Sequence, residues 1–405
     1  MTSRERILAS LGHREPDIVP LDLGGTESSG ISGIAYNRLR KHLRLGPGKT
    51  QVFDVYQQIV KIEEDVRAII RPDTIPLLIE PVGWKPTVLP DGSPCSIPEK
   101  WSPERDTNGD LVVRNEDGLV AARMPAGGFY FESAYAPLAR VDSPAGLDAH
   151  MGVLRDIESF DWPSYADESL DAIAARARTL FEETDLAIVA NLQLHLLAAG
   201  QLLRGYEQFM VDLLLDKPFA HALLERLCNA YIDRCERYFD RVGKLVQVAL
   251  VNDDLGTQNG PMLSPEVYRE MIWPYQKRLF GFIKSKTEAF ILFHSCGSVC
   301  RFIPDLIEAG VDALNPVQVS AAGMDTKRLK REFGSSITFW GGGCDTQHVL
   351  RNGAPDDIRS EVKRRVDDLS DGGGFVFTQV HNIQPDIPPE NIMAMYDAFE
   401  HYRRK

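Results

Sequence analysis

The sequence predicts a single α/β domain, a (β/α)8 barrel with a β-rich insertion near residues 81–138. Eight short apolar runs alternate with helical segments, which is the pattern of parallel strands joined by helices. Polar residues follow these runs, and a barrel gathers the carboxyl ends of its strands on one face. At 405 residues the chain is long enough to bury the core of one large barrel.

The expected strands and helices alternate along the chain. We expect strands at Asp17–Asp22, Thr74–Ile79, Leu186–Ala190, Leu245–Val251, Phe290–Phe293, Asp312–Asn315, Ile337–Trp340 and Gly374–Thr378. We expect helices at Arg4–His13, Tyr36–Arg44, Tyr56–Ile70, Leu170–Glu183, Tyr206–Leu214, Pro218–Val242, Phe302–Ala309, Asp325–Phe333, Asp356–Leu369 and Asn391–Tyr402. A further helix begins at Ser264-Pro265-Glu266, where serine is a favoured cap and proline suits the first turn.

Residues 81–138 differ in composition from the rest of the chain. Gly, Pro and Asp alternate there with short apolar pairs, as in NGDLVVRNEDGLVAARMP, which favours hairpins over helices. We interpret this segment as an excursion over one face of the barrel, a lid or a partner surface. The aromatic residues Phe129-Tyr130-Phe131 either cover a site or anchor the excursion to the barrel.

Composition limits the classes of partner. Lys and Arg number 45 against 58 Asp and Glu, and the net charge of −13 disfavours binding to nucleic acid or to an anionic membrane. No apolar run approaches the ~20 residues that span a bilayer, and the N-terminus is too charged for a signal peptide. Six cysteines in so long a chain do not indicate a disulfide framework. We therefore predict a cytoplasmic protein.

The most informative stretch is FILFHSCGSVC, Phe290–Cys300. It places His294 and Cys296 at the carboxyl end of an apolar strand, and Cys344 follows the strand expected at Ile337–Trp340. One nitrogen and two sulfur ligands suit a zinc ion with an open fourth position. The alternative is that His294 is a hydrogen-bonded core histidine and that both cysteines are small apolar fillers.

Other polar residues follow the remaining strands. Those expected to converge on the carboxyl face of the barrel are Asn191, Asp253, His294, Cys296, Asn315, Cys344 and His381. This convergence favours a metal site over scattered fillers. As catalytic candidates we name Asp253, Asp254 and His381, although the two aspartates equally suit a capping role and His381 could hold the last loop. As substrate-binding candidates we name Asn191, His195, Asn315 and Gln318.

Several motifs resemble the uroporphyrinogen decarboxylase superfamily, specifically its zinc-dependent corrinoid methyltransferase branch. The matching stretches are RERILASLGHREPDIVPLD (Arg4–Asp22), DDLGTQNGPMLSPEVYREMIWPY (Asp253–Tyr275), FHSCGSV (Phe293–Val299), GGGCDTQ (Gly341–Gln347) and HNIQPDIPPENIMAM (His381–Met395). The resemblance implies the same barrel. It also implies an enzyme that moves a methyl group between the cobalt of a corrinoid and a substrate such as coenzyme M, or a demethylase that methylates reduced corrinoid.

The chain departs from the decarboxylases of that superfamily in its first loop. There, arginines pair with the carboxylates of a tetrapyrrole, whereas this sequence has no arginine between Arg14 and Arg38. Asp148–Gly152 (DAHMG) nearly matches the motif of corrinoid carriers, but its glycine comes one residue early. We therefore expect the corrinoid (cobalamin) on a separate carrier protein.

The function we predict is a zinc-dependent methyltransferase that acts with a corrinoid protein on a small methylated substrate or a thiol. A zinc ion with thiolate ligands is suited to activating a soft nucleophile or a leaving group. The chain lacks an arginine cluster, which favours a weakly charged substrate and a demethylating direction. The alternatives are a metal-free decarboxylase and a non-catalytic corrinoid- or thiol-binding barrel with structural zinc. A homodimer is left open.

Overall fold

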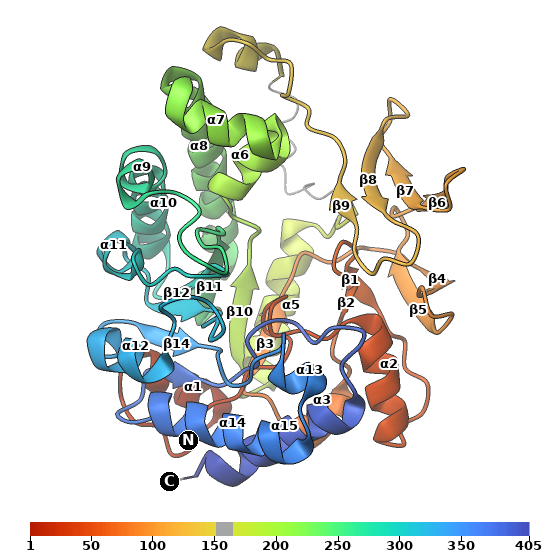
Figure 1. Ribbon diagram of the computed structural model, residues 1–405, viewed down its shortest axis with the longest axis vertical. Coiled ribbons are helices and arrows are strands. Elements are labelled where there is room, and N and C mark those ends of the chain that lie inside the picture. The colour runs from red at the N-terminus through yellow and green to blue at the C-terminus, as the bar shows by residue number, and fades with distance from the viewer. Residues whose placement is uncertain (151–164, 405) are drawn as a thin grey trace.

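A computed structural model describes residues 1–150 and 165–404 of the chain. At its centre lies a parallel sheet of seven strands in the order β15-β14-β13-β12-β11-β10-β3 (Figure 1). These strands are β3 (Thr74–Leu77), β10 (Ala187–Asn191), β11 (Val248–Asn252), β12 (Phe290–His294), β13 (Ala313–Asn315), β14 (Thr338–Trp340) and β15 (Phe375–Val376). The order follows the sequence, as it does in a (β/α)8 barrel.

An eighth segment joins the two edges of this sheet. Leu21 forms a parallel bridge with Phe377, just after β15, and the amide of Asp22 donates to the carbonyl of Phe377 over 2.8 Å. On its other side, the carbonyl of Leu21 accepts from the amide of Asp73, just before β3, over 2.7 Å. The expected strand Asp17–Asp22 is therefore reduced to a single bridge. Pro20 has no N–H to extend the ladder, and this accounts for the short pairing.

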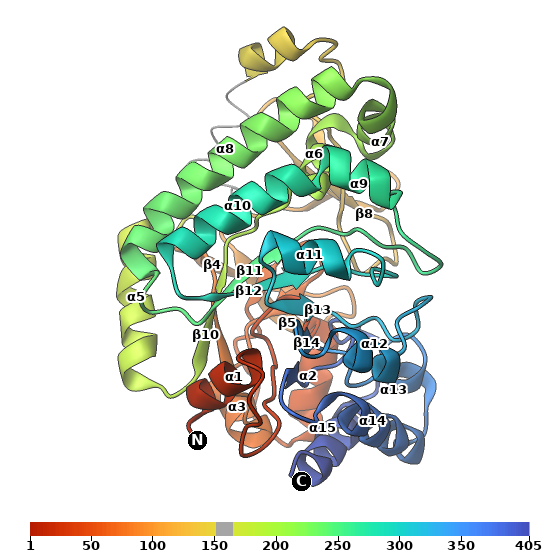
Figure 2. The same cartoon turned by 90° about the vertical axis from the view of Figure 1, so that its left-hand side faces the viewer.

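Helices surround the sheet (Figures 1 and 2). They are α1 (Ser3–Leu11), α2 (Gly33–His42), α3 (Glu64–Ile70), α5 (Leu170–Glu183), α6 (Leu197–Arg204), α7 (Tyr206–Leu215), α8 (Lys217–Val242), α9 (Pro265–Met271), α10 (Trp273–Lys286), α11 (Ile303–Ala309), α12 (Thr326–Phe333), α13 (Val349–Asn352), α14 (Pro355–Leu369) and α15 (Pro389–Tyr402). A short 3-10 helix, η1, spans Pro144–His150. Figure 2 shows α8 and α10 packed side by side along one flank. The predicted fold class is confirmed.

Strand residues alternate between two apolar layers. Ile188 and Ala190 of β10 pack outward against the helices, whereas Ala187 and Val189 pack inside the sheet. Ile7 and Leu11 of α1 belong to the same inner cluster as Ala187 and Val189. Helix α1 therefore buries its apolar face against the inner layer, and polar residues are left to gather where the strands end.

The helix expected at Tyr56–Ile70 begins only at Glu64. Before it, β1 (Val52–Asp54) and β2 (Ile59–Val60) form an antiparallel hairpin. The Asp54 carboxylate accepts from the amides of Tyr56 and Gln57 at 3.0 and 3.1 Å, so it stabilises a turn where a helix was expected.

The sequence also gave no expectation of α6, which begins two residues after His195. No residue next to α6 caps its first turn. Its cap comes from Asp253, which is distant in sequence and which a local pattern does not reveal.

The β-rich excursion is confirmed. It consists of a hairpin of β4 (Trp84–Val88) and β5 (Pro94–Pro98), and of a four-stranded antiparallel sheet. The strands of that sheet are β6 (Glu104–Arg105), β7 (Leu111–Arg114), β8 (Val120–Met124) and β9 (Glu132–Ser133). Figure 1 shows the excursion, in orange and yellow, to one side of the central sheet.

Two of the three aromatic residues named in this segment differ in burial. Phe131 is 7% exposed and packs edge-on against Trp101, with ring centroids 5.3 Å apart. Its amide donates to the carbonyl of Tyr56 over 2.9 Å. Phe129, by contrast, is 39% exposed. Phe131 therefore anchors the excursion to the β1–β2 hairpin. Among the described residues, no helix combines the length and apolarity needed to cross a bilayer.

We predict that Phe131→Ala lowers the free energy of unfolding by about 3 kcal/mol, because it removes a buried ring from the small cluster under the excursion. Phe129→Ala is the matched control and should change the stability by less than about 0.5 kcal/mol. Urea unfolding measures the stability, and limited proteolysis reports whether residues 81–138 are cut first. Equal effects of the two substitutions would contradict the anchoring role.

Candidate metal centre

Three neighbouring strands end with polar residues in register. Asn252 of β11 pairs with His294 of β12, and His294 pairs with Asn315 of β13. Because the strands are parallel, these side chains lie in one row at the carboxyl ends. This row is the base of the candidate site.

His294, Cys296 and His381 form a group that could hold a metal ion. One donor atom from each lies within 4.8 Å of the other two, and within the described part of the chain this is the single group of three or more such residues. Cys296 Sγ lies 3.6 Å from His294 Nε2, and the two imidazole rings are edge-to-face with centroids 5.9 Å apart. All three side chains are half-buried. They come from the end of β12, from the loop after it and from the loop after β15.

Asn315 fixes the orientation and the tautomer of His294. The Asn315 side-chain amide donates through Nδ2 to the carbonyl of Trp340 over 3.0 Å, so its Oδ1 faces the other way. That oxygen accepts from Ser28 Oγ and contacts His294 Nδ1, both at 2.7 Å. Since an amide oxygen only accepts, His294 Nδ1 carries the hydrogen and Nε2 keeps its lone pair toward Cys296.

The site favours uncharged imidazoles. Burial, with the nearby His294 as the next cause, lowers the pKa of His381 to about 4. Burial likewise lowers the pKa of His195 to about 4, with Arg234 as the next cause. Neutral imidazole is the form that binds a metal ion. Burial raises the pKa of Cys296 well above its usual value, so the metal-free residue is a thiol that would lose its proton on binding a metal.

Cys344, expected as the third metal ligand, lies outside this group. Its side chain is fully buried in the layer between sheet and helices. Burial raises its pKa, and the next cause is Glu361 on α14. The preceding glycines explain this position, because Gly341 and Gly342 have φ values of 114° and 74° and turn the chain sharply. The place beside His294 and Cys296 is taken by His381, which was expected as a catalytic residue.

The two aspartates after β11 have different environments. Asp253 is 2% exposed and accepts from the amides of Leu196 and Ala198 at 3.0 Å, which caps the start of α6. Burial raises its pKa to about 6. Asp254 is exposed, and its Oδ1 accepts from the amide of Cys296 over 2.8 Å and lies 3.9 Å from His294 Nε2. Asp254 therefore lies at the metal group, and Asp253 supports the fold around it.

Gln318 holds the turn that presents Cys296. Its Oε1 accepts from the amide of Gly297 over 2.7 Å, and its Nε2 donates to Gln258 over 2.8 Å. Gly297 has a φ of 82°, and a Cβ there would lie 2.4 Å from the carbonyl carbon of Gly256. No side chain larger than hydrogen fits at this turn.

Asn191 leads to a site residue that was not expected from the sequence. Its Nδ2 donates to Glu27 Oε1 over 2.5 Å, and Gln193 Nε2 donates to the same oxygen over 2.7 Å. Burial raises the pKa of Glu27 to about 7, and the nearby Asp54 contributes. Glu27 lies in the Gly/Ser-rich loop after the first strand. Its signal was available, because it is the single charged residue of the segment LGGTESSGIS.

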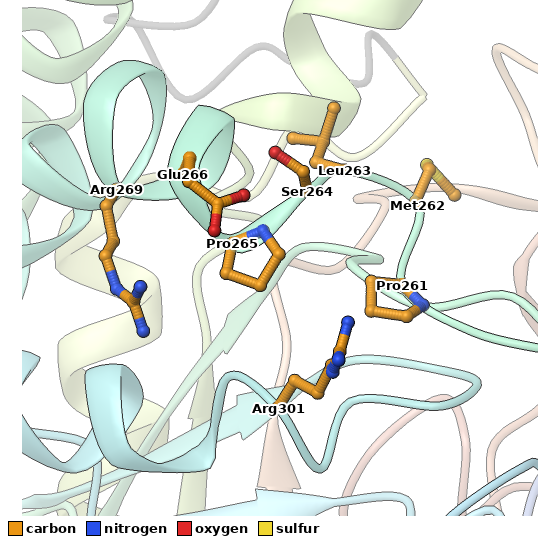
Figure 3. Close-up of a pocket in the computed structure, with 8 residues that line it drawn as sticks. All are labelled: Pro261, Met262, Leu263, Ser264, Pro265, Glu266, Arg269 and Arg301. Atoms are coloured by element: carbon orange, nitrogen blue, oxygen red, sulfur yellow. The ribbon is translucent and has the colours of Figure 1, made fainter.

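A surface hollow lies away from the group His294, Cys296 and His381. It lies beside the start of α9 (Figure 3). Its volume is about 580 Å³. Its lining residues are Pro261, Met262, Leu263, Ser264, Pro265, Glu266, Arg269 and Arg301. None of the candidate metal ligands lines it, and Arg269 is already paired with Asp305 over 2.9 Å. The candidate functional site is therefore the group His294, Cys296 and His381 at the strand ends.

Comparison with known proteins identifies the family. The sequence profile of the uroporphyrinogen decarboxylase (URO-D) family matches residues 147–402, more than half of the chain. The chain belongs to the uroporphyrinogen decarboxylase family. This confirms the resemblance noted in the sequence.

Curated relatives of this URO-D family member include two kinds of enzyme. A uroporphyrinogen decarboxylase from Pseudoalteromonas translucida is 27% identical over 192 residues, which are 46% of this chain and 49% of that protein. A methylcobamide:CoM methyltransferase from Methanosarcina mazei is 26% identical over 147 residues, which are 36% of this chain and 40% of that protein. The chain thus spans half or less of the length of these relatives.

A solved structure confirms the fold over the whole chain. A methyltransferase from Methanosarcina mazei superposes with a TM-score of 0.58 at 16% identity, and the match covers 99% of both chains. At this level of identity the similarity establishes the architecture alone.

We predict that Asn315→Ala releases the tautomer of His294, because the variant lacks the oxygen that accepts from Nδ1. Nitrogen-15 NMR of histidine-labelled metal-free protein should show bare Nε2 and protonated Nδ1 in the wild type, and a tautomer mixture in the variant. Gln318→Ala, which touches the Cys296 turn and not the imidazole, is the control. An unchanged tautomer in Asn315→Ala would exclude the positioning role.

Asp253 predicts a pH dependence of stability. Its folded-state pKa of about 6 lies above the ordinary value of 3.8, so the folded protein binds this proton more tightly than the unfolded chain does. The resulting stabilisation is complete below pH 3.8 and is lost as the pH rises through about 6. The stability of the wild type relative to Asp253→Asn should therefore fall by about 2 kcal/mol between pH 4.5 and 7.5. A difference that stays constant across this interval in urea unfolding would refute the assignment.

Proposed function

We propose that the protein is a zinc-dependent methyltransferase that moves a methyl group between a small substrate or thiol and the cobalt of a separate corrinoid protein. The observation that carries this proposal is the group His294, Cys296 and His381 at the ends of the barrel strands. The named activity of the Methanosarcina mazei methylcobamide:CoM methyltransferase supports it.

The donor set fits zinc. Two imidazole nitrogens and one thiolate are ligands that Zn²⁺ prefers, and three protein ligands leave a fourth position open, as in catalytic sites. A structural zinc is normally closed by four protein ligands, which disfavours the non-catalytic alternative. When bound, zinc would lower the pKa of a coordinated thiol or polarise a coordinated leaving group.

The chain's own residues prepare this site. Asn315 keeps Nε2 of His294 free and aimed at Cys296. Asp254 accepts from the amide of Cys296, and Gln318 accepts from the next amide, so the turn is held on two sides. Asp254 Oδ1 lies 3.9 Å from His294 Nε2, so a proton released at the site would reach this carboxylate through one bridging water.

The first loop disfavours decarboxylation of a tetrapyrrole. A substrate with many carboxylates needs cationic partners, and the chain has no arginine between Arg14 and Arg38. The loop instead brings the carboxyl group of Glu27 to the end of β10. The side chain at this position is thus an acid, whereas a site for a polycarboxylate needs a cationic side chain.

The corrinoid is assigned to a partner. Met151 and Gly152 of the near-match Asp148–Gly152 lie outside the described residues. Asp148 itself accepts from Arg226 of α8 over 2.6 Å, which commits it to an ion pair. Cobalamin titration of the protein alone should therefore show weak binding or none.

Metal analysis of two variants decides the ligand set. His381→Ala should lose most of the roughly one equivalent of zinc bound per chain, because one of three protein ligands is removed. Cys344→Ala, the matched control, should retain it, because the Cys344 side chain is buried in the apolar core and lies outside the proposed ligand group. Loss of zinc from Cys344→Ala with retention in His381→Ala would instead support the set His294, Cys296 and Cys344 expected from the sequence.

We favour the demethylating direction, in which a methylated donor passes its methyl group to reduced corrinoid. The enzyme, a reduced corrinoid protein and a panel of methoxy, methylthio and methylamine compounds are mixed, and methyl-cobalt formation is followed by absorbance. Zinc-loaded wild type should methylate the corrinoid at least about 100-fold faster than His294→Ala. If no donor reacts while methylcobalamin methylates a thiol, the thiol methyltransferase direction replaces the one favoured here.

A further inference from the structure

Glu27 has an arrangement that the metal group does not explain. Its Oε1 accepts two amide hydrogens, from Asn191 and from Gln193. Burial raises the pKa of Glu27 to about 7, with Asp54 as the next cause, although the side chain is only half-buried. Glu27 is therefore a half-buried acid at the carboxyl end of β10, not part of a sealed apolar core.

A second acid, Asp54, lies close enough to Glu27 to affect its pKa. Asp54 raises the pKa of Glu27, and burial raises the pKa of Asp54 itself. Its carboxylate oxygens accept only from amides, namely the backbone of Tyr56 and Gln57 and the Gln57 side chain. No lysine or arginine is among the main groups that set the pKa of either acid.

Aromatic rings stand beside these acids. Trp101 packs against Tyr56 and Tyr165, with ring centroids 5.5 and 5.6 Å apart. Both tyrosines are half-buried, and Asp54 raises the pKa of each. Glu27 also acts on Tyr165. Aromatic rings with electron-rich faces next to unpaired carboxyl groups make a surface that attracts cations.

Two short chains of hydrogen bonds connect these acids to the metal group. Ser28, the residue after Glu27, donates to the Asn315 oxygen that holds His294. On the other side, Gln57 accepts from the side chain of Asn382, the residue after His381, over 2.7 Å. Since Gln57 also donates to Asp54, a ligand that contacts both acids would lie near the candidate metal ligands.

We propose that Glu27 determines the specificity for the small substrate, and that this substrate carries a cationic nitrogen. The inference rests on the proposed methyltransferase function and names the substrate class of that same site. A neutral ligand would bury Glu27 and Asp54 without compensating their charge, which is unfavourable. A cationic nitrogen offsets that charge and meets the faces of Tyr56 and Tyr165. This refines the weakly charged substrate expected from the sequence.

The experiment compares cations with their carbon isosteres. Zinc-loaded full-length protein is titrated by calorimetry with choline, tetramethylammonium and trimethylamine, and with the uncharged matches 3,3-dimethylbutan-1-ol and tert-butyl methyl ether. Wild type should bind at least one cation about tenfold or more tightly than its isostere. Glu27→Gln keeps the size and an acceptor oxygen but removes the charge, and it should reduce this preference to about twofold or less.

Controls separate recognition from folding and from the proposed function. Glu116→Gln changes an exposed acid on the excursion and should leave the cation preference unchanged. Zinc content and the urea midpoint of Glu27→Gln should match those of the wild type. Equal binding of cations and isosteres by the wild type, or a preference that survives in Glu27→Gln, would overturn the inference.

The two proposals fail in different ways. Methylation of the corrinoid protein by neutral donors, without preference for a cation, leaves the methyltransferase function standing and refutes the role of Glu27. A cation preference that depends on Glu27, in a protein that methylates no corrinoid with any donor, supports the binding site and refutes the function.

Discussion

The parallel register of β11, β12 and β13 is the constraint on which the site depends. It sets Asn252, His294 and Asn315 in one row, each at the last residue of its strand. A shift of one residue would turn Phe293 toward the position of His294 and carry its ring away from the outer core. The alternation of inward and outward apolar residues along these strands opposes such a shift. A shifted strand would turn its inward-facing residues toward the helices and its outward-facing residues toward the inside of the barrel.

The register alone does not make a metal ligand, because an imidazole at a strand end can rotate and exchange tautomers. Here a single amide removes both freedoms. Asn315 donates to Trp340 of the next strand and accepts from His294, so the direction of one hydrogen bond dictates the direction of the other. Ser28 completes the set by donating to the same oxygen. The orientation and the tautomer of His294 are thus set by neutral, buried partners. These partners do not titrate in the physiological pH range.

The sequence predicted the barrel, the excursion and the pair His294 and Cys296, because each rests on a local pattern: apolar runs, turn residues and a strand followed by soft ligands. It could not assign the third member of the group. Cys344 and His381 both follow apolar runs, and no local pattern indicates that the ring of His381 lies beside that of His294 whereas the side chain of Cys344 is buried in the core. Long-range contacts were equally invisible. Asp253 caps α6 across 57 residues, so no residue within or beside α6 indicates where this helix begins.

Trp340 joins the site to the closure of the barrel. Its backbone oxygen holds Asn315, while its indole N–H donates to Asp22 Oδ2 over 2.8 Å, and the other oxygen of Asp22 accepts from Thr74 at the start of β3. Trp340 of β14 is therefore linked through Asp22 to β3 across the closure of the barrel, and the same residue orients the side-chain amide of Asn315. Variation in substrate specificity, natural or engineered, is constrained at Trp340, Asp22 and Asn315, because a substitution there affects both the closure of the barrel and the site. It has more room in residues 81–138 and in the loop around Glu27, which can diverge while the closed barrel and its ligand geometry are inherited intact.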